Sequence, residues 1–297
     1  MTHVTEPRAS GTFGSVPSPT PMRALLLCLL ALAAACDTAE APSAGLDPDV
    51  GPVTSGAWAR PAADVTWQWQ LSGSINTAYD VDLYDVDLWE TPDATLRQLR
   101  DRGVLVLCYF SAGSGDENRP DYASFTSADL GNRLDGYPSE RWLDIRSETV
   151  WAVMLSRLDL AAARGCDGVE PDNVDGYTND PGFDLTARDQ LAFNRTLANE
   201  AHRRGLFVAL KNSGDQAADL VDYFDLELNE QCALYDECEQ LAPFAEVGKP
   251  VLQVEYAEAR AEAVTLSRTV CPAATAAGRR TLVLPLDLDD AFRVSCF

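Results

Sequence analysis

Histidine is almost absent from this sequence. Its 297 residues include two histidines, and only His202 lies beyond the first 35 positions. Catalytic Ser-His-Asp and Cys-His arrangements need a well-placed imidazole, and histidine-based zinc sites need several. His202 stands among polar residues in a predicted helix, so we expect it to be a solvated helix residue. An enzyme of this sequence must therefore depend on carboxylates.

Basic charge is also scarce. The chain has 23 lysines and arginines against 46 aspartates and glutamates, for a net charge of -23. Such a charge repels nucleic acid and anionic lipid surfaces, which excludes nucleic acid as a partner and favours cationic or neutral ones. The same charge can also serve only to keep an exported protein in solution.

Long apolar runs are limited to one near the N-terminus, residues 24–35, which Cys36 follows directly. This arrangement resembles a lipoprotein signal peptide, with lipidation at Cys36 and residues 1–21 as a misassigned start. Ala33 stands where leucine is commoner, so secretion without a lipid stays open. We expect residues 1–36 to be a signal segment of an exported protein, either a cell-envelope lipoprotein or a secreted one. The membrane is then contacted only through the N-terminal lipid.

No CxxC motif occurs, which removes support for zinc-ribbon and thioredoxin-like interpretations. Six cysteines follow Cys36, and an even number in an oxidising compartment predicts disulfides. We predict the disulfides Cys232–Cys238 and Cys271–Cys296. The remaining two cysteines, Cys108 and Cys166, lie on two neighbouring predicted strands, and their pairing stays open.

Residues 37–63 contain several prolines and glycines and show no apolar period. This composition is typical of a flexible tether. We therefore expect a single folded domain over residues 64–297. Its length is close to the roughly 250 residues of a typical (β/α)8 barrel.

Eight short β-rich runs alternate with helical patterns in this domain. Runs such as 104–107 are continuously apolar, as in parallel strands that are covered on both faces. Arg-Gly pairs at 102–103, 164–165 and 204–205 directly precede strands, where a glycine can end a helix. The sequence therefore predicts an α/β fold, a (β/α)8 TIM barrel. Its predicted strands are 65–71, 79–88, 104–110, 166–172, 206–211, 224–229, 250–256 and 281–286.

The predicted loops differ in length at the two ends of the strands. Links from helix to strand are short, whereas the links from strand to helix at 111–147 and 173–185 are long. In this architecture the C-terminal ends of the strands carry the active site. Only about seven residues separate the first two predicted strands, too few for a helical crossover. The first βα unit is therefore expected to be irregular.

Acidic side chains cluster at the predicted strand ends. Glu170 and Asp172 close the fourth strand, Glu230 the sixth and Glu255 the seventh. Glycoside cleavage needs one carboxyl group to protonate the leaving oxygen and a second to attack the sugar or activate water. Lys211 ends the fifth strand, where a buried cation could keep one carboxylate ionised. A purely structural ion pair of Lys211 with Glu170 or Asp172 fits the sequence equally well.

Several ordered motifs carry a family resemblance. The segments WQWQLSG, YDVDLYD, CYFSAGSGDENRPDY, GCDGVEPDNVDGY, LKN, NEQCALYDEC and VEY resemble the TIM-barrel family typified by endo-α-1,4-polygalactosaminidase, glycoside hydrolase family 114. The resemblance covers the chain from Trp67 to the C-terminus. It implies hydrolysis of α-1,4-linked galactosamine polymers, with Asp172 of EPDN and Glu230 of NEQC as the catalytic pair.

The roles of the pair follow from the same resemblance. Related barrels place a nucleophile on strand four and an acid/base on strand six, which assigns Asp172 and Glu230 to these roles. We therefore expect a retaining mechanism, with the carboxyl groups about 5 to 5.5 Å apart rather than the roughly 6.5 to 9.5 Å of inverting enzymes.

The substrate that the resemblance implies gives the acidic charge a purpose, because partly deacetylated galactosamine polymers carry ammonium groups. Within the long loop, Glu117 and Asp121 could equally well form ion pairs that order the loop instead of binding substrate, with Arg119 as the partner of one of them. Trp67 and Trp69 are expected to pack in the core. The candidate substrate-binding residues are Asp82, Asp85, Tyr109, Glu117, Arg119, Asp121, Glu170, Asn173, Lys211, Asn212, Asn229, Glu255 and Tyr256.

Two other interpretations remain open from the sequence. The same barrel could hold polysaccharide at the cell surface without cleaving it. The acidic rim could bind calcium, although no DxDxDG pattern is present and Asp287, Asp289 and Asp290 are too few to form a site alone. We expect no metal, no cofactor and a monomeric protein.

Overall fold

Eight parallel strands form the centre of the protein in the computed structural model, which describes residues 45–297. The predicted signal segment, the lipidation site Cys36 and the first part of the predicted tether lie outside the described residues. All eight predicted strands are present, within a few residues of their expected bounds. They are β1 (Trp67–Gln70), β2 (Leu83–Asp87), β3 (Leu105–Ser111), β7 (Gly168–Asp172), β8 (Phe207–Lys211), β9 (Leu226–Glu230), β10 (Val251–Tyr256) and β11 (Arg280–Leu284).

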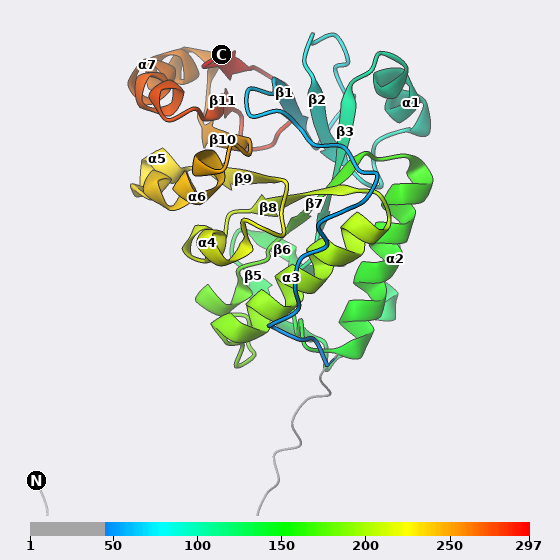
Figure 1. The fold of residues 1–297 in the computed structure, drawn as a ribbon. Coiled ribbons are helices and arrows are strands. Elements are labelled where there is room, and N and C mark those ends of the chain that lie inside the picture. The colour runs from blue at the N-terminus through cyan, green and yellow to red at the C-terminus, as the bar shows by residue number, and fades with distance from the viewer. Residues whose placement is uncertain (1–44) are drawn as a thin grey trace, which may run out of the picture. The chain divides into compact units, whose positions relative to one another are not determined.

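The strands follow one another in chain order around a curled sheet, β1-β2-β3-β7-β8-β9-β10-β11 (Figure 1). A short strand, β12 (Val294–Ser295), adds antiparallel to β11. The two ends of the sheet meet, since Trp67 on β1 and Leu282 on β11 belong to one buried cluster. Trp67 Nε1 also donates a hydrogen bond to the Arg280 carbonyl at 2.7 Å. The sheet therefore has the α/β barrel architecture that the sequence predicts.

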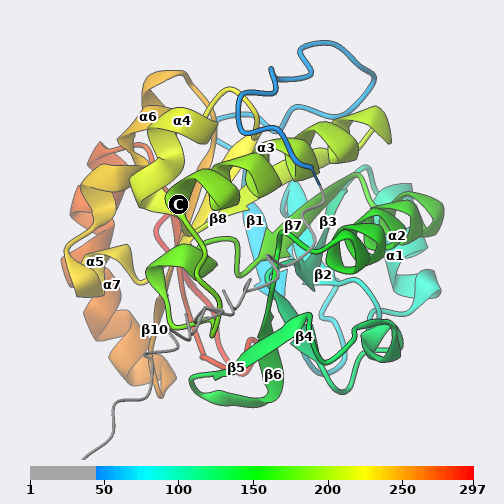
Figure 2. The ribbon, with the colours of Figure 1, turned by 90° about the horizontal axis from the view of Figure 1, so that it is seen from below.

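Helices surround the strands, as the view along the barrel shows (Figure 2). Residues 71–82, between β1 and β2, contain neither helix nor strand, so the first βα unit is irregular as predicted. Ser147 caps α2 by accepting from the Thr149 amide, and Gly165 ends that helix with φ 81°. The helices are α1 (Asp93–Asp101), α2 (Glu148–Arg164), α3 (Ala187–Arg203), α4 (Ala217–Leu220), α5 (Cys232–Tyr235), α6 (Ala242–Glu246) and α7 (Arg260–Ala276).

Side chains alternate between the barrel interior and the helices along each strand. On β8, Phe207 and Ala209 belong to the interior cluster, whereas Val208 and Leu210 pack in the cluster beneath the helices. Continuing the alternation by two residues directs Lys211 inward at the C-terminal end of β8. The same alternation places the last inward residues of β7, β9 and β10 around Lys211.

A small antiparallel sheet interrupts the link between β3 and α2. It consists of β4 (Ser114–Asp116), β6 (Tyr137–Leu143) and β5 (Leu130–Leu134), paired in the order β4-β6-β5. The turn between β5 and β6 contains Gly136 with φ 79°, a conformation that favours glycine. The sequence predicts only a long loop in this region. Figure 2 shows the small sheet beside the barrel strands, on the side away from α3.

Residues 45–63 lack helix and strand but pack against the barrel, which differs from the expected free tether (Figure 1). Asn199 on α3 accepts from the Val53 amide at 2.7 Å and donates to the Gly51 carbonyl at 2.9 Å. Trp58 is buried, and its indole donates to Asp225 at 3.0 Å. Composition alone could not show these contacts, because their partners lie far away along the chain.

Three disulfides are present: Cys108–Cys166, Cys232–Cys238 and Cys271–Cys296. The two predicted pairs are confirmed. The pair left open links β3 to Cys166, two residues before β7, and β7 is the neighbour of β3 in the sheet. No helix within residues 45–297 is long and apolar enough to cross a membrane.

Candidate active site

A cavity of about 840 Å³ opens at the C-terminal ends of the barrel strands. Its floor is formed by Tyr109 near the end of β3 and by the last inward residues of β7, β8, β9 and β10. Its walls come from the β5–β6 hairpin, the segment after β7 and the loop after β11. Seven candidate residues from the sequence line it: Tyr109, Asp172, Asn173, Lys211, Asn212, Glu230 and Tyr256.

Lys211 is the centre of the cavity floor and one of only two lysines in the chain. Its Nζ lies 3.2 Å from Asp172 Oδ1, 3.1 Å from Glu230 Oε2 and 3.0 Å from Glu170 Oε1. Burial lowers the pKa of the ammonium, but the charges of Asp172, Glu170 and Glu230 outweigh burial and raise the pKa well above its ordinary value. Lys211 is therefore a fixed cation that three carboxylates share.

Asp172 and Glu230 keep part of their surface open to the cavity, since 18% and 26% of their side chains are exposed. Their oxygens nearest to Lys211 lie no more than about 6.3 Å apart, which is the sum of their 3.2 Å and 3.1 Å distances to Nζ. This limit falls below the roughly 6.5 to 9.5 Å separation of inverting glycosidases. The spacing leaves room for a nucleophile and an acid/base on one anomeric carbon.

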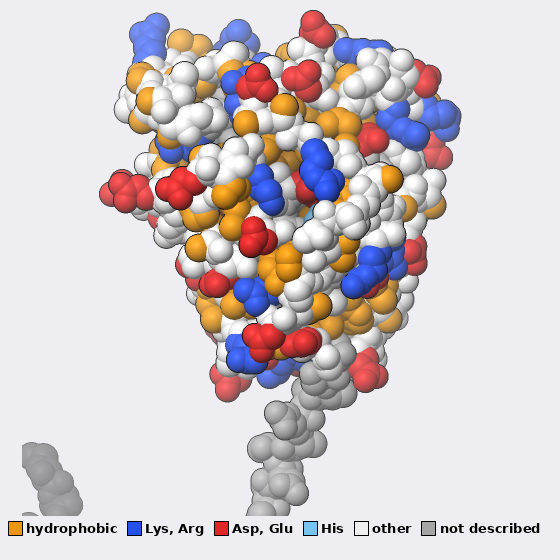
Figure 3. Space-filling model, viewed as in Figure 1, with side chains coloured by type: hydrophobic (Ala, Val, Ile, Leu, Met, Phe, Trp, Pro, Cys, Tyr) orange, Lys and Arg blue, Asp and Glu red, His pale blue; other side chains and the backbone are white. Residues whose placement is uncertain are grey.

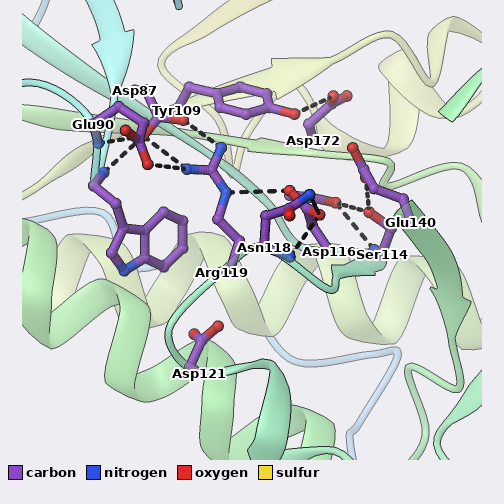
Figure 4. Close-up of polar contacts among 12 residues, drawn as sticks. Asp87, Glu90, Tyr109, Ser114, Asp116, Asn118, Arg119, Asp121, Glu140 and Asp172 are labelled. Atoms are coloured by element: carbon purple, nitrogen blue, oxygen red, sulfur yellow. Dashed lines mark hydrogen bonds and ion pairs between the residues drawn. The ribbon is translucent and has the colours of Figure 1, made fainter. Parts of the chain in front are cut away.

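Asp172 is held by its neighbours on two strands. The Tyr109 hydroxyl donates to its Oδ2 at 3.2 Å (Figure 4). The Asn173 amide donates to its Oδ1 at 2.7 Å. Asn173 has φ 59°, and its side-chain amide donates to Ser111 Oγ at 2.9 Å. These bonds fix the direction of the carboxylate.

Glu230 is held by hydrogen bonds from Tyr256 Oη and from Asn212 Nδ2, the latter at 3.2 Å. Burial raises the pKa of Glu230. Lys211 and the hydrogen bonds from Tyr256 and Asn212 outweigh burial, so that the pKa is lowered overall. In the unliganded site Glu230 is therefore held as a carboxylate.

Asn229 supports the site without lining it. Its side chain donates to Asn212 Oδ1 at 3.4 Å and accepts from the Cys232 amide at 3.1 Å. The Cys232–Cys238 disulfide thus begins directly beside the strand end that carries Glu230.

The sequence did not indicate several of the carboxylates that line the cavity, and two of them, Asp175 and Glu140, have raised pKa values. Burial and the charge of Asp172 raise the pKa of Asp175 to about 6. Glu140 on β6 accepts from Ser114 Oγ, and burial raises its pKa despite that bond (Figure 4). The short spacing from Asp172 could have indicated Asp175. No sequence signal marks Glu140, because the hairpin brings it to the cavity.

Other candidate residues lie outside the cavity. Asp82 precedes β2 at the opposite end of the barrel and accepts from Thr66 Oγ1 at 2.6 Å. Glu255 points outward from β10 and accepts from the Ala233 amide at 2.9 Å. The alternation along a strand explains Glu255, since the inward neighbour is Tyr256. Asp85 is fully buried in the barrel interior.

The long-loop candidates do not line the cavity themselves but form ion pairs, and Arg119 does not pair with either expected partner. Arg119 lies 3.0 Å from Asp87 at the end of β2 (Figure 4). Glu117 pairs with Arg133 at 3.3 Å, and Asp121 pairs with Arg157 at 2.7 Å. These partners come from β2, the β5–β6 hairpin and α2, which local spacing could not show.

His202 and the two barrel tryptophans have clear environments. Trp67 and Trp69 are buried as predicted, and the Trp69 ring lies 4.9 Å from Lys211 Nζ. His202 is buried rather than solvated, because Trp58 stacks on its ring and Asp225 lies 2.8 Å from its Nε2. This group lies at the opposite end of the barrel. Within residues 45–297, no group of three or more His, Cys, Asp or Glu side chains could hold a metal ion.

Residues 50–297 match the family described as glycoside-hydrolase family GH114. The chain belongs to that family. It is a glycoside hydrolase, and the catalytic face of its barrel is the one that holds the cavity.

Two solved structures agree with the fold. The crystal structure of Aspergillus fumigatus Ega3 in complex with galactosamine is 40% identical, with a TM-score of 0.78, over 83% of this chain and 100% of that chain. The glycoside hydrolase domain of PelA from Pseudomonas aeruginosa is 16% identical, with a TM-score of 0.61, over 79% of this chain and 98% of that chain. The second likeness concerns the fold alone. No match was found among curated proteins.

Proposed function

We propose that this GH114 protein hydrolyses α-1,4-linked galactosamine polymers within the chain, using Asp172 and Glu230. The observation that carries the proposal is the sharing of Lys211 Nζ by these two carboxylates in one solvent-open cavity. The similarity to Ega3, whose structure holds galactosamine, supports an amino sugar as the bound unit.

The charge of the cavity favours a cationic substrate. Its two basic side chains cannot balance its acids, since Lys211 is already shared by three carboxylates. Ammonium groups of a deacetylated polymer would be attracted to this excess and held near the cavity floor. The lining acids are Asp135, Glu140, Asp172, Asp175, Asp180, Glu230 and Asp287, against Arg133 and Lys211.

The cavity mouth also offers apolar surface for sugar rings. Tyr137 at the tip of the β5–β6 hairpin is 55% exposed, and Leu286 after β11 is 60% exposed. Both line the cavity although they come from different elements. The aromatic face of Tyr137 can pack against the C–H faces of a sugar, and Leu286 adds apolar surface, so both side chains suit binding of polymer units beyond the cleaved bond.

The proposed reaction has two steps. Asp172 attacks the anomeric carbon while Glu230 gives its proton to the glycosidic oxygen, so that one sugar–oxygen bond breaks and a glycosyl-aspartate forms. Glu230, now a carboxylate, takes a proton from water, and the resulting oxygen nucleophile releases the sugar from Asp172. Lys211 offsets the negative charge on both groups.

The first step requires a proton on Glu230, which the unliganded site holds as a carboxylate. A sugar ring seated over Glu230 removes water from it and favours the neutral form. Because the pKa of Glu230 is lowered in the free enzyme, protonating Glu230 costs free energy at neutral pH. We therefore expect acidic conditions to favour productive binding of the substrate.

We further propose that the enzyme is exported. The three disulfides suit an oxidising compartment, and the predicted signal segment supplies a route to it. Lipidation at Cys36 would then tether the domain to a membrane. Each chain carries a complete cavity, which supports action as a monomer.

The test is a digest of amino-polysaccharides with the masses of released oligosaccharides recorded. We expect fragments of several lengths from α-1,4-galactosamine polymer and none from neutral polymers of similar size. Binding of the polymer without release of fragments would contradict the proposal and favour a polysaccharide-binding protein instead.

A further inference from the structure

Two carboxyl groups lie in the barrel interior beneath Lys211. Asp85 on β2 and Glu170 on β7 point inward and are fully buried. The interior cluster of the same layer is otherwise apolar, with residues such as Leu107 and Leu228. The two carboxyl groups contact each other. Apart from Lys211, no other group among residues 45–297 provides their oxygens with a partner.

Two fully buried carboxyl groups in contact cannot both be ionised, because burial removes them from bulk solvent and, among residues 45–297, Lys211 is the one cation in contact with the pair. One proton is therefore shared. Lys211 Nζ lies 3.0 Å from Glu170, which favours the charge on Glu170 and the proton on Asp85. Burial and the charge of Glu170 raise the pKa of Asp85 well above its ordinary value.

The apolar surroundings suggest a functional reason for this pair. Buried ionic groups can often be replaced by apolar residues at little cost in stability, so folding alone does not require them here. Their one link to the cavity is through Lys211, which also contacts Asp172 and Glu230.

We propose that protonated Asp85 donates a hydrogen bond to Glu170, and that Glu170 anchors Lys211 where its ammonium reaches both Asp172 and Glu230. Asp85 and Glu170 are positioning residues in this arrangement, since neither touches the cavity. The proposal rests on the proposed function of Asp172 and Glu230. It adds that Asp85 and Glu170, deeper in the barrel, fix the position of the Lys211 ammonium group that the two catalytic carboxylates share.

The first test compares Asp85→Asn with Asp85→Leu on the galactosamine polymer. The asparagine amide can still donate to Glu170, so we expect kcat within about threefold of the wild type. Leucine matches its apolar layer but cannot donate, so a shift of Lys211 should lower kcat by about 100-fold with little change in KM. Equal kcat for wild type and Asp85→Leu, or equal losses for both variants, would overturn the proposal.

Glu170→Gln tests the same arrangement from the other side and serves if the leucine variant does not fold. It keeps the shape of Glu170 but removes the charge that anchors Lys211, so kcat should again fall by about 100-fold. Unchanged kcat in Glu170→Gln would contradict the anchoring role.

A stability measurement is independent of any substrate. The groups that face Asp85 are Glu170 and Asp172 on β7 and Lys211 on β8. As pH rises above the ordinary range of aspartate, the unfolded chain loses the Asp85 proton while the folded protein keeps it, so wild-type stability falls. Asp85→Asn has no such proton. The urea midpoint of Asp85→Asn minus that of the wild type should therefore increase as the pH rises from 4 to 8.

A constant difference across this pH range would show that Asp85 does not hold the proton. Failure of the wild type to cleave any polymer would instead contradict the proposed function, and the stability measurement would still decide whether Asp85 is the donor. The two failures are therefore distinguishable.

Discussion

The two ends of the barrel both bury charged groups, but they treat them differently. At the C-terminal end, Lys211 is surrounded by carboxylates that remain partly open to a cavity of about 840 Å³. At the N-terminal end, Asp225 accepts from Trp58 Nε1, lies 2.8 Å from His202 Nε2 and accepts from the Val208 amide. Only 7% of the Asp225 side chain is exposed.

This difference separates a reactive site from a structural one. The Asp225 group fastens residues 45–63 and α3 to the barrel, and Arg60 covers Trp58 at 4.0 Å. The face in Figure 3, which includes α3, shows acidic and basic side chains interspersed rather than gathered. Buried charge alone therefore does not mark a catalytic site. The exposure of the carboxylates to a cavity distinguishes the catalytic end, where 18% of the Asp172 side chain and 26% of the Glu230 side chain are exposed.

The largest effect is expected when the open carboxylates are neutralised. Asp172→Asn and Glu230→Gln should each lower kcat by at least about 1000-fold, because one removes the nucleophile and the other the acid/base. The assay is release of oligosaccharides from the galactosamine polymer, with circular dichroism to verify folding. Appreciable turnover by a folded Asp172→Asn protein would remove Asp172 from the catalytic pair.

A smaller loss is expected when the shared cation is removed. Lys211→Met keeps the length of the side chain but leaves Glu170 buried without its cation, so kcat should fall by about 100-fold. Stability at neutral pH should fall by about 3 kcal/mol. Urea unfolding and initial rates measure the two effects, and Lys249→Met, at the other lysine, is the matched control. Wild-type kinetics in Lys211→Met would show that the cation is dispensable.

The pH dependence of kcat/KM should reflect the lowered pKa of Glu230. Only the protonated form of Glu230 can act as acid in the free enzyme, so kcat/KM should fall about tenfold per pH unit above that pKa. The maximum should therefore lie on the acidic side of neutrality. Tyr256→Phe removes a hydrogen bond that holds the carboxylate, and it should move the falling limb to higher pH. An unchanged limb in this variant would argue against Glu230 as the acid.

The smallest effect on activity is expected at the opposite end of the barrel. Trp58→Ala removes a buried ring that packs on His202, so stability should fall by about 3 kcal/mol. The cavity is not touched, so kcat should stay within about twofold at a temperature where the variant is folded. A large loss of kcat in a folded Trp58→Ala protein would break the division between the two ends.

Much of the site could be predicted because strand geometry is periodic. Continuously apolar runs indicated the strands, and polar residues at their ends had to converge at one rim. Asp172, Lys211 and Glu230 follow this rule, since each is the last inward residue of its strand. The same periodicity directs the Glu255 side chain outward from β10. The presence of an acidic residue at a strand end does not by itself show whether its side chain points into the barrel or away from it.

The features that were missed depend on contacts between distant segments. Glu140 reaches the cavity only because β5 and β6 form a hairpin over it, and no apolar period marks that hairpin. His202 looked solvated because its own helix is polar. Its burial comes from Trp58, which lies in a segment whose composition suggested a free tether.

The central claim is that Asp172 and Glu230 act together on one anomeric carbon, with Asp172 as the nucleophile. The most direct measurement is the anomeric configuration of the first product from the galactosamine polymer, followed by proton NMR before mutarotation. We predict retention, with the α-anomer formed first, because the two oxygens that contact Lys211 Nζ, one from each carboxylate, lie no more than about 6.3 Å apart. A first product in the β configuration would contradict the account.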